Sequence, residues 1–568
     1  MKKIWKKVEK QKNFDKLEKH IKDKYKFSDL TAKILAEKNF QTDDEIDVFL
    51  NPKRSDFRNP FDMPDMTKAI DRIIKAIDNK EKIIIYGDYD ADGITSTTIL
   101  KRFFKDIGVD ADYYIPNRLS EGYGMSISAV EKIAEMGYNL IITVDCGITS
   151  VNEVERAKEL NVDVIITDHH EPAGNIPEAV AVVDCKRKDN KYPFRELAGC
   201  GVAFKITQAL SEKLNINENE YLKYLDIACI GTISDIVPLV DENRIIAKLG
   251  LLLVNQTRNV GLRELIKLTG YKKITSESVS FGISPRINAC GRMGHQEVAL
   301  ELFLTNDPIK ARELAKKLED FNKERQQIEK RIYEEAEELI QENKEAEKPC
   351  VILGKENWHH GIIGIVSSKI TEKYYKPSVL VCFEGEDARG SGRSIKGFDL
   401  HEALLNLKEY LVTAGGHSMA AGLSLKTNDF ENFKKAFEEY AKDKITPEML
   451  ESEILIDEEI KKEDANISSV NELSLLEPFG EGNSKPCILY KNLKIKSIRT
   501  LSEGKHIKMT LQDDNINIDA IGFNMGNLAE DYRIDDVIDV VGNIEINTFN
   551  NRDSVQINLK DIRKSINQ

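Results

Sequence analysis

The sequence has no long apolar run. No stretch approaches the roughly 18 consecutive apolar residues that a membrane-spanning helix needs. The first residues, MKKIWKKVEKQKNF, also lack the apolar segment and small-residue cleavage site of a secretory signal. Neither a membrane protein nor a secreted protein is expected, and the predicted location is the cytoplasm.

Cysteine pairs are absent, and glycine and proline are few. The eight cysteines include no C-x-x-C pair and no histidine at zinc-ligand spacing, which argues against a structural zinc site or a disulfide framework. We expect reduced, mostly buried thiols. With 33 glycines and 15 prolines in 568 residues, the composition is that of a folded chain, not a disordered one.

The size of the chain predicts several domains. Its 568 residues exceed what one hydrophobic core supports, and about three to five domains follow from usual domain sizes. The net charge of −14 argues mildly against nucleic acid as a partner, because phosphate contact needs a positive surface. Only local charge decides this, and clustered metal-binding carboxylates would inflate the negative count.

The hydropathy pattern changes at about residue 81 and again at about residue 220. Residues 1–80 have helical periodicity that breaks near Pro52, Pro60 and Pro64, and are expected to form an N-terminal helical cap. Residues 81–305 start with apolar runs that alternate with helical segments and become helical from about residue 220. This alternation predicts a parallel βαβ sheet.

Three further regions follow. Residues 306–347 carry apolar residues at helical spacing within a charged stretch, which predicts a long connecting helix. Residues 348–448 have the pattern of a second α/β lobe, and residues 449–568 contain about five strand-like segments, typical of a small β-barrel such as an OB-fold. The predicted fold class is a multidomain α/β protein with a parallel-sheet domain, a long connecting helix, a second α/β lobe and a C-terminal β-barrel.

Acidic and histidine side chains follow three of the predicted strands. KIIIYG, NLIITV and VDVIIT are followed by Asp88, Asp90 and Asp92, by Asp145, and by Asp168, His169 and His170, respectively. Because the carboxyl ends of parallel strands meet at the edge where open α/β sheets bind ligands, these groups are expected to converge. A single acid at a strand end is more often a turn or helix cap, so the prediction depends on that convergence.

A divalent cation would offset the repulsion between these carboxylates. Asp88 to Gly93 also matches the first half of a calcium-binding loop, but Ile99 stands where that loop needs glutamate, and a strand precedes it. Carboxylates with adjacent histidines suit manganese or magnesium, whereas zinc favours three His or Cys ligands. Two such ions could activate a water and stabilise a departing oxygen.

The three strand-end segments resemble a known family. GDYDADG, VDCG and TDHH are similar to motifs of the DHH phosphoesterase superfamily. Further segments resemble motifs of its RecJ exonucleases, in RecJ order and over nearly the whole chain: GTISDIVPL, SPRINACGRMG, WHHGIIGIVSS, GSGRS, GGHSMAAG and PFGEGN. The resemblance implies a DHH catalytic domain at 81–305, a DHHA1 domain at 348–448 and an OB-fold at 449–568.

The resemblance also implies roles for the acidic edge. Two divalent ions, Mn²⁺ or Mg²⁺, would be bound by five ligands, namely Asp90, Asp92, Asp145, His169 and Asp235. Asp88 would lie in or next to that shell, and His170 would face the scissile phosphate. Asp235 rests on the resemblance alone, because an aspartate before a Pro turn is more often a cap or an exposed side chain.

Basic residues in other motifs are expected to hold the substrate. Arg286, Asn288 and Arg292 lie in a segment otherwise poor in charge, which fits either a buried phosphate clamp or a solvated face. The resemblance implies that a second group binds the 5′-terminal phosphate or the phosphate near the cut: Arg118, Ser391, Arg393 and His417. One departure is WHHG, where relatives often have proline at His360, so His359 is taken as the motif residue.

The C-terminal region is expected to contact a single strand. Lysines, Arg499 and His506 lie on the predicted barrel with Tyr490 near them, which is compatible with a groove for phosphates and a stacked base, or with an ordinary solvated surface. Small-substrate DHH enzymes lack this barrel and the N-terminal cap. The full domain set therefore favours a polymeric strand, whereas a preference for DNA over RNA is implied only by the resemblance.

The predicted activity is that of a metal-dependent 5′→3′ exonuclease specific for single-stranded DNA, which releases 5′-mononucleotides during recombination and repair. One alternative is a DHH phosphodiesterase of short oligoribonucleotides or cyclic dinucleotides. A third possibility is an inactive single-strand-binding scaffold, in which acidic residues at the metal-ligand positions would be expected to have been replaced. The resemblance further implies a monomer that works with a RecQ-type helicase and single-strand-binding protein.

Overall fold

The computed structural model describes residues 3–549 and 552–565 and divides into two compact units. The larger unit contains residues 52–450 with 480–482, and the smaller contains the chain up to residue 51 with 451–479 and the segment from 483.

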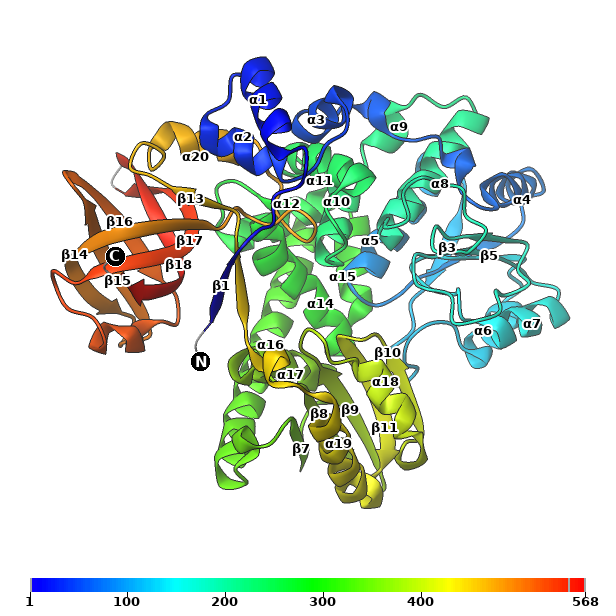
Figure 1. Cartoon of the computed structure of the whole chain (residues 1–568). Coiled ribbons are helices and arrows are strands. Elements are labelled where there is room, and N and C mark those ends of the chain that lie inside the picture. Colours follow the sequence, from blue (N-terminus) through cyan, green and yellow to red (C-terminus); the bar gives the residue numbers. More distant parts are fainter. Residues whose placement is uncertain (1–2, 550–551, 566–568) are drawn as a thin grey trace. The chain divides into compact units, whose positions relative to one another are not determined.

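A five-stranded parallel sheet forms the first part of the larger unit (Figure 1). Its strand order is β3-β2-β4-β5-β6, and all neighbouring strands are parallel. The bounds are Ile83–Tyr86 (β2), Ala111–Tyr114 (β3), Leu140–Thr143 (β4), Asp163–Thr167 (β5) and Ala181–Val183 (β6). The predicted parallel sheet is confirmed, and β6 is a strand that the hydropathy pattern did not indicate.

Both faces of this sheet are covered by helices, and its strand β2 has apolar, buried side chains at every position. Ile83 and Ile85 pack into one core with α4, α5 and α8, whereas Ile84 and Tyr86 pack into the other with α6 and α7. This alternation follows from the two-residue period of a strand. The helices are Met66–Asp78 (α4), Ala91–Asp106 (α5), Ile127–Glu135 (α6), Val151–Glu159 (α7) and Gly199–Lys213 (α8).

A helical region follows the sheet, as predicted. Its helices are Asn219–Leu222 (α9), Leu225–Ser234 (α10), Asp241–Val254 (α11), Val260–Thr269 (α12), Ser276–Ser278 (α13), Ser284–Arg292 (α14) and Gln296–Leu304 (α15). A π-helical turn, Val279–Ile283 (η3), leads directly into α14. One helix of 35 residues, Pro308–Glu342 (α16), then occupies the charged stretch for which a connecting helix was expected.

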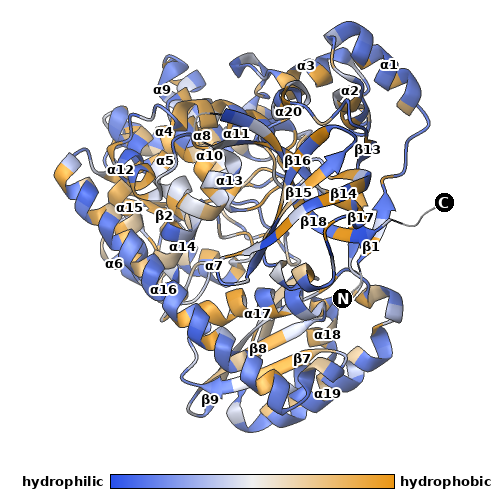
Figure 2. Ribbon diagram, turned by 90° about the vertical axis from the view of Figure 1, so that its left-hand side faces the viewer, coloured by the Kyte–Doolittle hydropathy of each residue, from blue (hydrophilic) through white to orange (hydrophobic). Residues whose placement is uncertain are grey.

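The second α/β lobe contains a mixed five-stranded sheet of order β10-β11-β9-β8-β7. Its strands are Val351–Glu356 (β7), Ser378–Glu384 (β8), Asp387–Arg393 (β9), Thr413–Gly416 (β10) and Ala420–Lys426 (β11). The helices are His360–Tyr374 (α17), Leu400–Asn406 (α18) and Phe430–Lys444 (α19). Strands β7 and β8 include hydrophobic residues (Figure 2), and most of their side chains are buried.

The smaller unit contains a closed barrel. Strands β14, β15, β16, β18 and β17 pair in that order, and β14 also pairs with β17, which closes the sheet. Their bounds are Ile488–Leu501 (β14), His506–Asp513 (β15), Ile516–Gly522 (β16), Val537–Phe549 (β17) and Arg552–Lys564 (β18). A small five-stranded barrel was the prediction for this region, and it is confirmed.

Helices from both ends of the chain complete the smaller unit. Its other elements are Ile4–Lys7 (β1), Phe14–Tyr25 (α1), Asp29–Ala36 (α2), Asp43–Leu50 (α3), Glu453–Ile456 (β12), Glu458–Ile460 (β13) and Ile467–Ser474 (α20). The N-terminal strand β1 pairs in parallel with β12. The helices before residue 52 thus pack with the C-terminal segment, whereas α4, also within the expected N-terminal cap, belongs to the larger unit.

The cysteines and the length and apolar character of the helices were also predicted from the sequence. All eight cysteines are free and buried, as predicted. Within residues 3–549 and 552–565, no helix combines the length and apolar character needed to cross a membrane.

Candidate metal centre and substrate pocket

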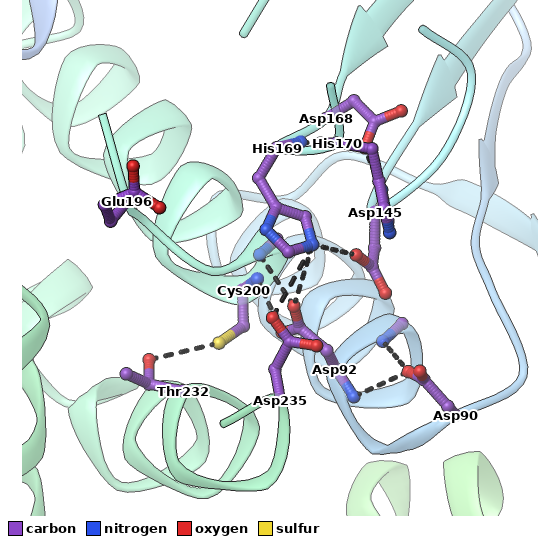
Figure 3. Close-up of polar contacts among 12 residues, drawn as sticks. Asp90, Asp92, Asp145, Asp168, His169, His170, Glu196, Cys200, Thr232 and Asp235 are labelled. Atoms are coloured by element: carbon purple, nitrogen blue, oxygen red, sulfur yellow. Dashed lines mark hydrogen bonds and ion pairs between the residues drawn. The ribbon is translucent and has the colours of Figure 1, made fainter. Parts of the chain in front are cut away.

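The acidic groups at the strand ends converge around His169. Its Nε2 lies 3.0 Å from Asp145 Oδ1, 3.7 Å from Asp235 Oδ2 and 3.8 Å from Asp92 Oδ2 (Figure 3). Asp88 and Asp90 follow β2, Asp145 follows β4 and His169 follows β5, whereas Asp235 ends helix α10. The structure therefore brings together all five predicted metal ligands and Asp88.

Backbone groups fix the directions of the two acids on α5. Asp92 accepts hydrogen bonds from the N–H groups of Gly199 (2.7 Å) and Cys200 (2.8 Å), at the start of α8. Asp90 caps α5 by accepting from the N–H groups of Asp92 (2.9 Å) and Gly93 (3.0 Å). These backbone hydrogen bonds hold both carboxylates in place. Burial is the largest influence on Asp92 and raises the pKa of its carboxyl.

Close backbone approach makes room for the cluster. A Cβ at Gly199 would lie 2.5 Å from Asp145 Oδ1, and one at Gly231 would lie 2.2 Å from Thr95 Oγ1. Asp145 itself has φ of 61°, a left-handed conformation that is uncommon outside glycine. Such local strain is typical of functional sites, where the surrounding structure holds a side chain in place.

The cluster has the properties of a cation site. Among the described residues, Asp88 Oδ1 is buried and has no hydrogen-bond partner, and the buried atoms Asp145 Oδ1 and His169 Nε2 make no hydrogen bond although they lie 3.0 Å apart. Burial, followed by the neighbouring carboxylates, raises the pKa of Asp88, Asp145 and Asp235 well above the ordinary value. Buried like charges of this kind are stable only if they are protonated or bind a cation.

The donor atoms divide into overlapping groups. Asp92, His169 and Asp235 form one group, and Asp88, Asp90 and Asp145 form a second. Asp145 and His169 also form a third group with His170, and in each group the ligand atoms lie within 4.8 Å of one another. Burial, followed by the nearby His170, lowers the pKa of His169 to about 4, so its ring is neutral and able to bind a metal. Carboxylate oxygens with a single imidazole suit Mn²⁺ or Mg²⁺ and fit poorly with a zinc site.

Asp168 holds the second histidine of the motif. Its Oδ1 accepts from His170 Nδ1 at 2.7 Å and from the His169 N–H at 2.7 Å, and its Oδ2 accepts from the Ile148 N–H at 2.9 Å. Burial acts to lower the pKa of His170, but the hydrogen bond and the charge of Asp168, together with the charges of Asp235 and Asp90, outweigh it and raise that pKa to about 9. His170 is therefore a cation at neutral pH, with Asp168 as its positioning residue, a role that the sequence did not indicate.

A pocket of 580 Å³ opens between the parallel-sheet domain and the second lobe. Its lining includes four predicted substrate residues, namely Arg118, Arg292, Ser391 and Arg393. Burial, followed by repulsion from Arg118 and Arg393, lowers the pKa of Arg292 to about 9, and burial also lowers the pKa of Arg393. Clustered, partly desolvated guanidinium groups favour an anion such as a phosphate.

Arg389 also lines this pocket, and sequence reasoning missed it. It lies on β9 with Ser391 and Arg393, so the three residues alternate along one strand. Since side chains at every second position point to the same face, this spacing was a usable signal. Tyr89 and His360 are further lining residues that were not assigned to the substrate.

Three other predicted residues, Arg286, Asn288 and His417, are not among the lining residues of this pocket. Asn288 Oδ1 accepts from the Ala91 N–H at 2.8 Å and so holds the first turn of α5. Arg286 donates to Glu319 on α16 (2.6 Å) and to the Gly282 carbonyl (2.5 Å). His417 is exposed in the turn between β10 and β11, and no hydrogen bond or ion pair described for residues 3–549 joins its side chain to the metal ligands. Substrate roles for Arg286 and His417 remain predictions.

The barrel differs from expectation at its aromatic residue. Tyr490 is 2% exposed and donates to Asp513, so its use as a stacking surface for a base was wrong. It belongs to β14 of a closed barrel, where alternate side chains point into the core. Several predicted lysines form ion pairs with carboxylates, among them Lys491 with Glu459 and Lys494 with Asp535.

An exposed aromatic residue lies elsewhere on the barrel. Phe523, just after β16, is 52% exposed and packs edge-on against His506, with ring centroids 5.3 Å apart. A half-exposed ring beside an imidazole is the kind of surface on which a base stacks.

Comparisons with known proteins agree with this arrangement. Three family models match: the DHH family, N-terminal domain, over residues 82–232, the DHHA1 domain over 347–443 and the RecJ OB domain over 456–561. The chain is 40% identical over 548 residues to the single-stranded-DNA-specific exonuclease RecJ of Bacillus subtilis, across 96% of this chain and 69% of that protein. The chain belongs to the RecJ family. RecJ from Thermus thermophilus has been solved with Mn²⁺ and with Mg²⁺.

These two RecJ structures share the fold of this chain. The Mn²⁺ complex has a TM-score of 0.86 at 29% identity and covers 99% of this chain and 80% of that one. The Mg²⁺ complex has a TM-score of 0.80 at 28% identity and covers 99% and 79%. The fold class predicted from the sequence is that of RecJ proteins.

Proposed function

We propose that this RecJ-family chain is a metal-dependent exonuclease that hydrolyses single-stranded DNA from its 5′ end and releases 5′-mononucleotides. Mn²⁺ or Mg²⁺ is the cofactor, bound by Asp90, Asp92, Asp145, His169 and Asp235, with Asp88 beside them. Two divalent ions in such a cluster supply activation of a water and stabilisation of the departing oxygen.

One observation supports this proposal most directly. Tyr89, which lines the arginine pocket, lies in the chain between Asp88 and Asp90 of the metal cluster, and the Arg118 guanidinium lies 5.1 Å from the centroid of its ring. The pocket for an anionic group therefore begins next to the metal ligands. A terminal phosphate held by the arginines would leave the next phosphodiester within reach of the cluster.

The polarity follows from this placement. When the terminal phosphate occupies the pocket, the bond cleaved is the P–O3′ bond that joins the first nucleotide to the second. The first nucleotide leaves with its 5′-phosphate and a 3′-hydroxyl, and the shortened strand keeps a new 5′-phosphate. That new end carries the same anionic group, so it can enter the pocket in turn.

His170 supplies a charge at the scissile phosphate in this scheme. Its Nδ1–H is used by Asp168, so its Nε2–H is the group that can donate to a phosphate oxygen. A cationic imidazole with pKa about 9 stabilises the negative charge that builds on the phosphate during attack. Arg292, which donates to the Gly361 carbonyl at 2.8 Å, ties the second lobe to this side of the pocket.

We further propose a division of labour among the predicted domains. Residues 81–305 form the catalytic DHH domain, residues 348–448 form the DHHA1 lobe that holds the strand end, and residues 449–568 contact the strand beyond it. The connecting helix at 306–347 joins the two lobes, and residues 1–80 form the N-terminal helical region. The exposed Phe523 and the partly buried His506 beside it are the barrel residues best suited to stack a base.

Neither alternative activity is favoured. An inactive scaffold would have lost ligands, whereas every predicted ligand is present and clustered. A phosphodiesterase of short oligoribonucleotides or cyclic dinucleotides would not need the barrel that matches the RecJ OB domain. A cytoplasmic location, a monomeric state and cooperation with single-strand-binding protein and a RecQ-type helicase are further proposals that follow from the family.

The test is an end-labelled degradation assay with the full chain. Single-stranded DNA labelled at either end, duplex DNA, RNA oligomers and cyclic dinucleotides are incubated with Mn²⁺, with Mg²⁺ and with chelator. We expect 5′-mononucleotides from single-stranded DNA only with metal, and none from Asp145→Asn. Asp226→Asn, a buried aspartate outside the cluster, is the control variant and should keep activity. Cleavage of the small substrates alone, or initiation at the 3′ end, contradicts the proposal.

A further inference from the structure

The loop of residues 117–124, called the pocket loop below, touches both the arginine pocket and His170. Arg118, Ser120, Glu121 and Gly122 line the pocket. The next residue, Tyr123, has its hydroxyl 3.2 Å from His170 Nδ1 and 3.3 Å from His170 Nε2. This short segment therefore contacts both the arginine pocket, where the 5′ end of the strand is proposed to bind, and His170, which is expected at the scissile phosphate.

The pocket loop is held at its ends. Glu121 accepts from the Asn117 N–H (2.8 Å) and from the Tyr114 hydroxyl (2.6 Å), which closes the first half of the loop. At its far end, the Gly124 carbonyl accepts from the Tyr86 hydroxyl at 3.1 Å. Side-chain hydrogen bonds therefore tie the pocket loop near its beginning and at its end.

Tyr123 lies between two glycines with positive φ. Gly122 and Gly124 have φ of 83° and 80°, conformations that side chains other than glycine rarely adopt. The Tyr123 ring meets the His170 ring edge-on, with centroids 5.6 Å apart, and its hydroxyl also lies 3.4 Å from the Asp145 carbonyl oxygen. The hydroxyl thus contacts the side chain of His170 and the backbone of a metal ligand.

The second lobe also reaches this loop. Arg389 Nη1 donates to the Leu119 carbonyl at 3.5 Å, and Arg389 lines the pocket as well. An anion that draws Arg118 and Arg389 together changes the contacts on both sides of the loop. The pocket loop therefore contacts Arg389 of the second lobe at Leu119 and His170 at Tyr123.

We propose that Tyr123 is a positioning residue for His170, and that the pocket loop couples occupancy of the arginine pocket by a 5′-phosphate to the orientation of that histidine. The proposal rests on the proposed function and deepens it. A 5′-phosphate would then do more than anchor the strand: it would speed the cleavage step itself. A strand end without phosphate would bind and be cut slowly even when the enzyme is saturated.

The test compares single-turnover cleavage of single-stranded DNA with a 5′-phosphate and with a 5′-hydroxyl at saturating enzyme. In the wild type, we expect the 5′-phosphate to raise the rate constant of the first cleavage about tenfold, the effect of one hydrogen bond to a charged group. In Tyr123→Phe, this advantage in rate constant should disappear, whereas the advantage of the 5′-phosphate in half-saturating concentration should remain.

Two further variants make the test specific. Tyr138→Phe removes a hydroxyl that donates to Asp112 at 2.6 Å, outside the pocket loop, and should behave as wild type. Glu121→Gln weakens the hydrogen bonds that Glu121 accepts from Tyr114 and Asn117 and leaves Tyr123 unchanged. It should reduce the factor by which the 5′-phosphate raises the rate constant of cleavage.

The coupling is overturned if Tyr123→Phe slows both substrates equally, if it slows neither, or if the wild type gains no rate from the 5′-phosphate. A wild type that cuts neither strand contradicts the proposed function itself, and so the two failures are distinguished.

Discussion

Replacing Asp145 with asparagine is expected to make the metal-free protein more stable and to abolish its stabilisation by Mn²⁺. The carboxyl is 2% exposed, and its pKa is raised well above the ordinary value by burial and then by Asp92 and the other acids of the cluster. Asparagine keeps the shape of the side chain and removes the charge. It also removes a ligand atom that belongs to two of the candidate metal groups.

The size of the metal effect follows from linkage. An ion that binds only the folded state, present at about 100 times its Kd, stabilises that state by about 2.7 kcal/mol. One kcal/mol shifts the Tm of a domain of 150 to 250 residues by about 2–4 °C, and a larger unit responds near the lower end. The wild type should therefore gain about 5 °C with saturating Mn²⁺, and Asp145→Asn about 1 °C or less.

The pH dependence has a definite sign. Asp88, Asp145, Asp235 and His170 have folded-state pKa values raised above their ordinary values, so the folded state holds protons more tightly than the unfolded state. Such groups stabilise the fold at low pH, and this contribution is lost as pH rises through the folded pKa. In chelator, the free energy of unfolding of the wild type should fall between neutral pH and about pH 9, the value for His170. The slope should be smaller for Asp145→Asn.

Thermal unfolding followed by circular dichroism, in chelator and in Mn²⁺, measures both effects. Asp226→Asn, a buried aspartate that accepts a hydrogen bond from Thr257 outside the cluster, should keep the full Mn²⁺ response. If Asp145→Asn is less stable than the wild type in chelator, repulsion between the buried carboxylates does not limit the stability of the metal-free protein. If Mn²⁺ still raises its Tm by as much as in the wild type, the metal lies elsewhere.

Three further predictions concern catalysis and binding. Asp168→Asn should lower the pKa of His170 from about 9 toward its ordinary value, so the alkaline limit of the pH–rate profile should move down; an unmoved limit would separate His170 from catalysis. Arg389→Ala should reduce the preference for 5′-phosphorylated over 5′-hydroxyl strands, measured as the ratio of their affinities in a competition assay, by about tenfold. An equal loss of affinity for both strands would contradict the pocket assignment. Phe523→Ala should weaken strand binding by about 1–3 kcal/mol without changing the saturated cleavage rate, and unchanged affinity in a titration would exclude the ring as a base contact.

The strand-end part of the metal centre is predictable from the sequence because parallel strands deliver their following residues to one edge. Asp88, Asp145 and His169 follow three buried strands, and that pattern alone implies convergence. Asp235 is different, because it ends a helix more than 60 positions beyond His169 in the chain, and no periodicity points to it. Only the resemblance to a family could assign it before the structure.

Other features depend on packing that hydropathy does not encode. Tyr490 was expected on the surface, but closure of the barrel turns that position of β14 into the core. The pairing of β1 with β12 joins segments separated by some 450 residues, so neither strand has a local signal beyond its own short run. The role of Asp168 could not be predicted from the sequence, because it depends on a local backbone conformation that brings the His170 ring back to the Asp168 carboxylate.

The metal centre also explains why the surrounding fold must be tightly packed. Glycines at 199 and 231 let α8 and α10 approach the acids so closely that a Cβ would lie within 2.5 Å of a neighbouring side-chain oxygen. The same closeness excludes water that would otherwise solvate Asp88 and Asp145 and reduce their repulsion. Natural proteins tolerate such destabilising charge where function requires it, provided that the remaining structure compensates. Here the two apolar cores, one on either side of the sheet, supply packing that offsets this charge.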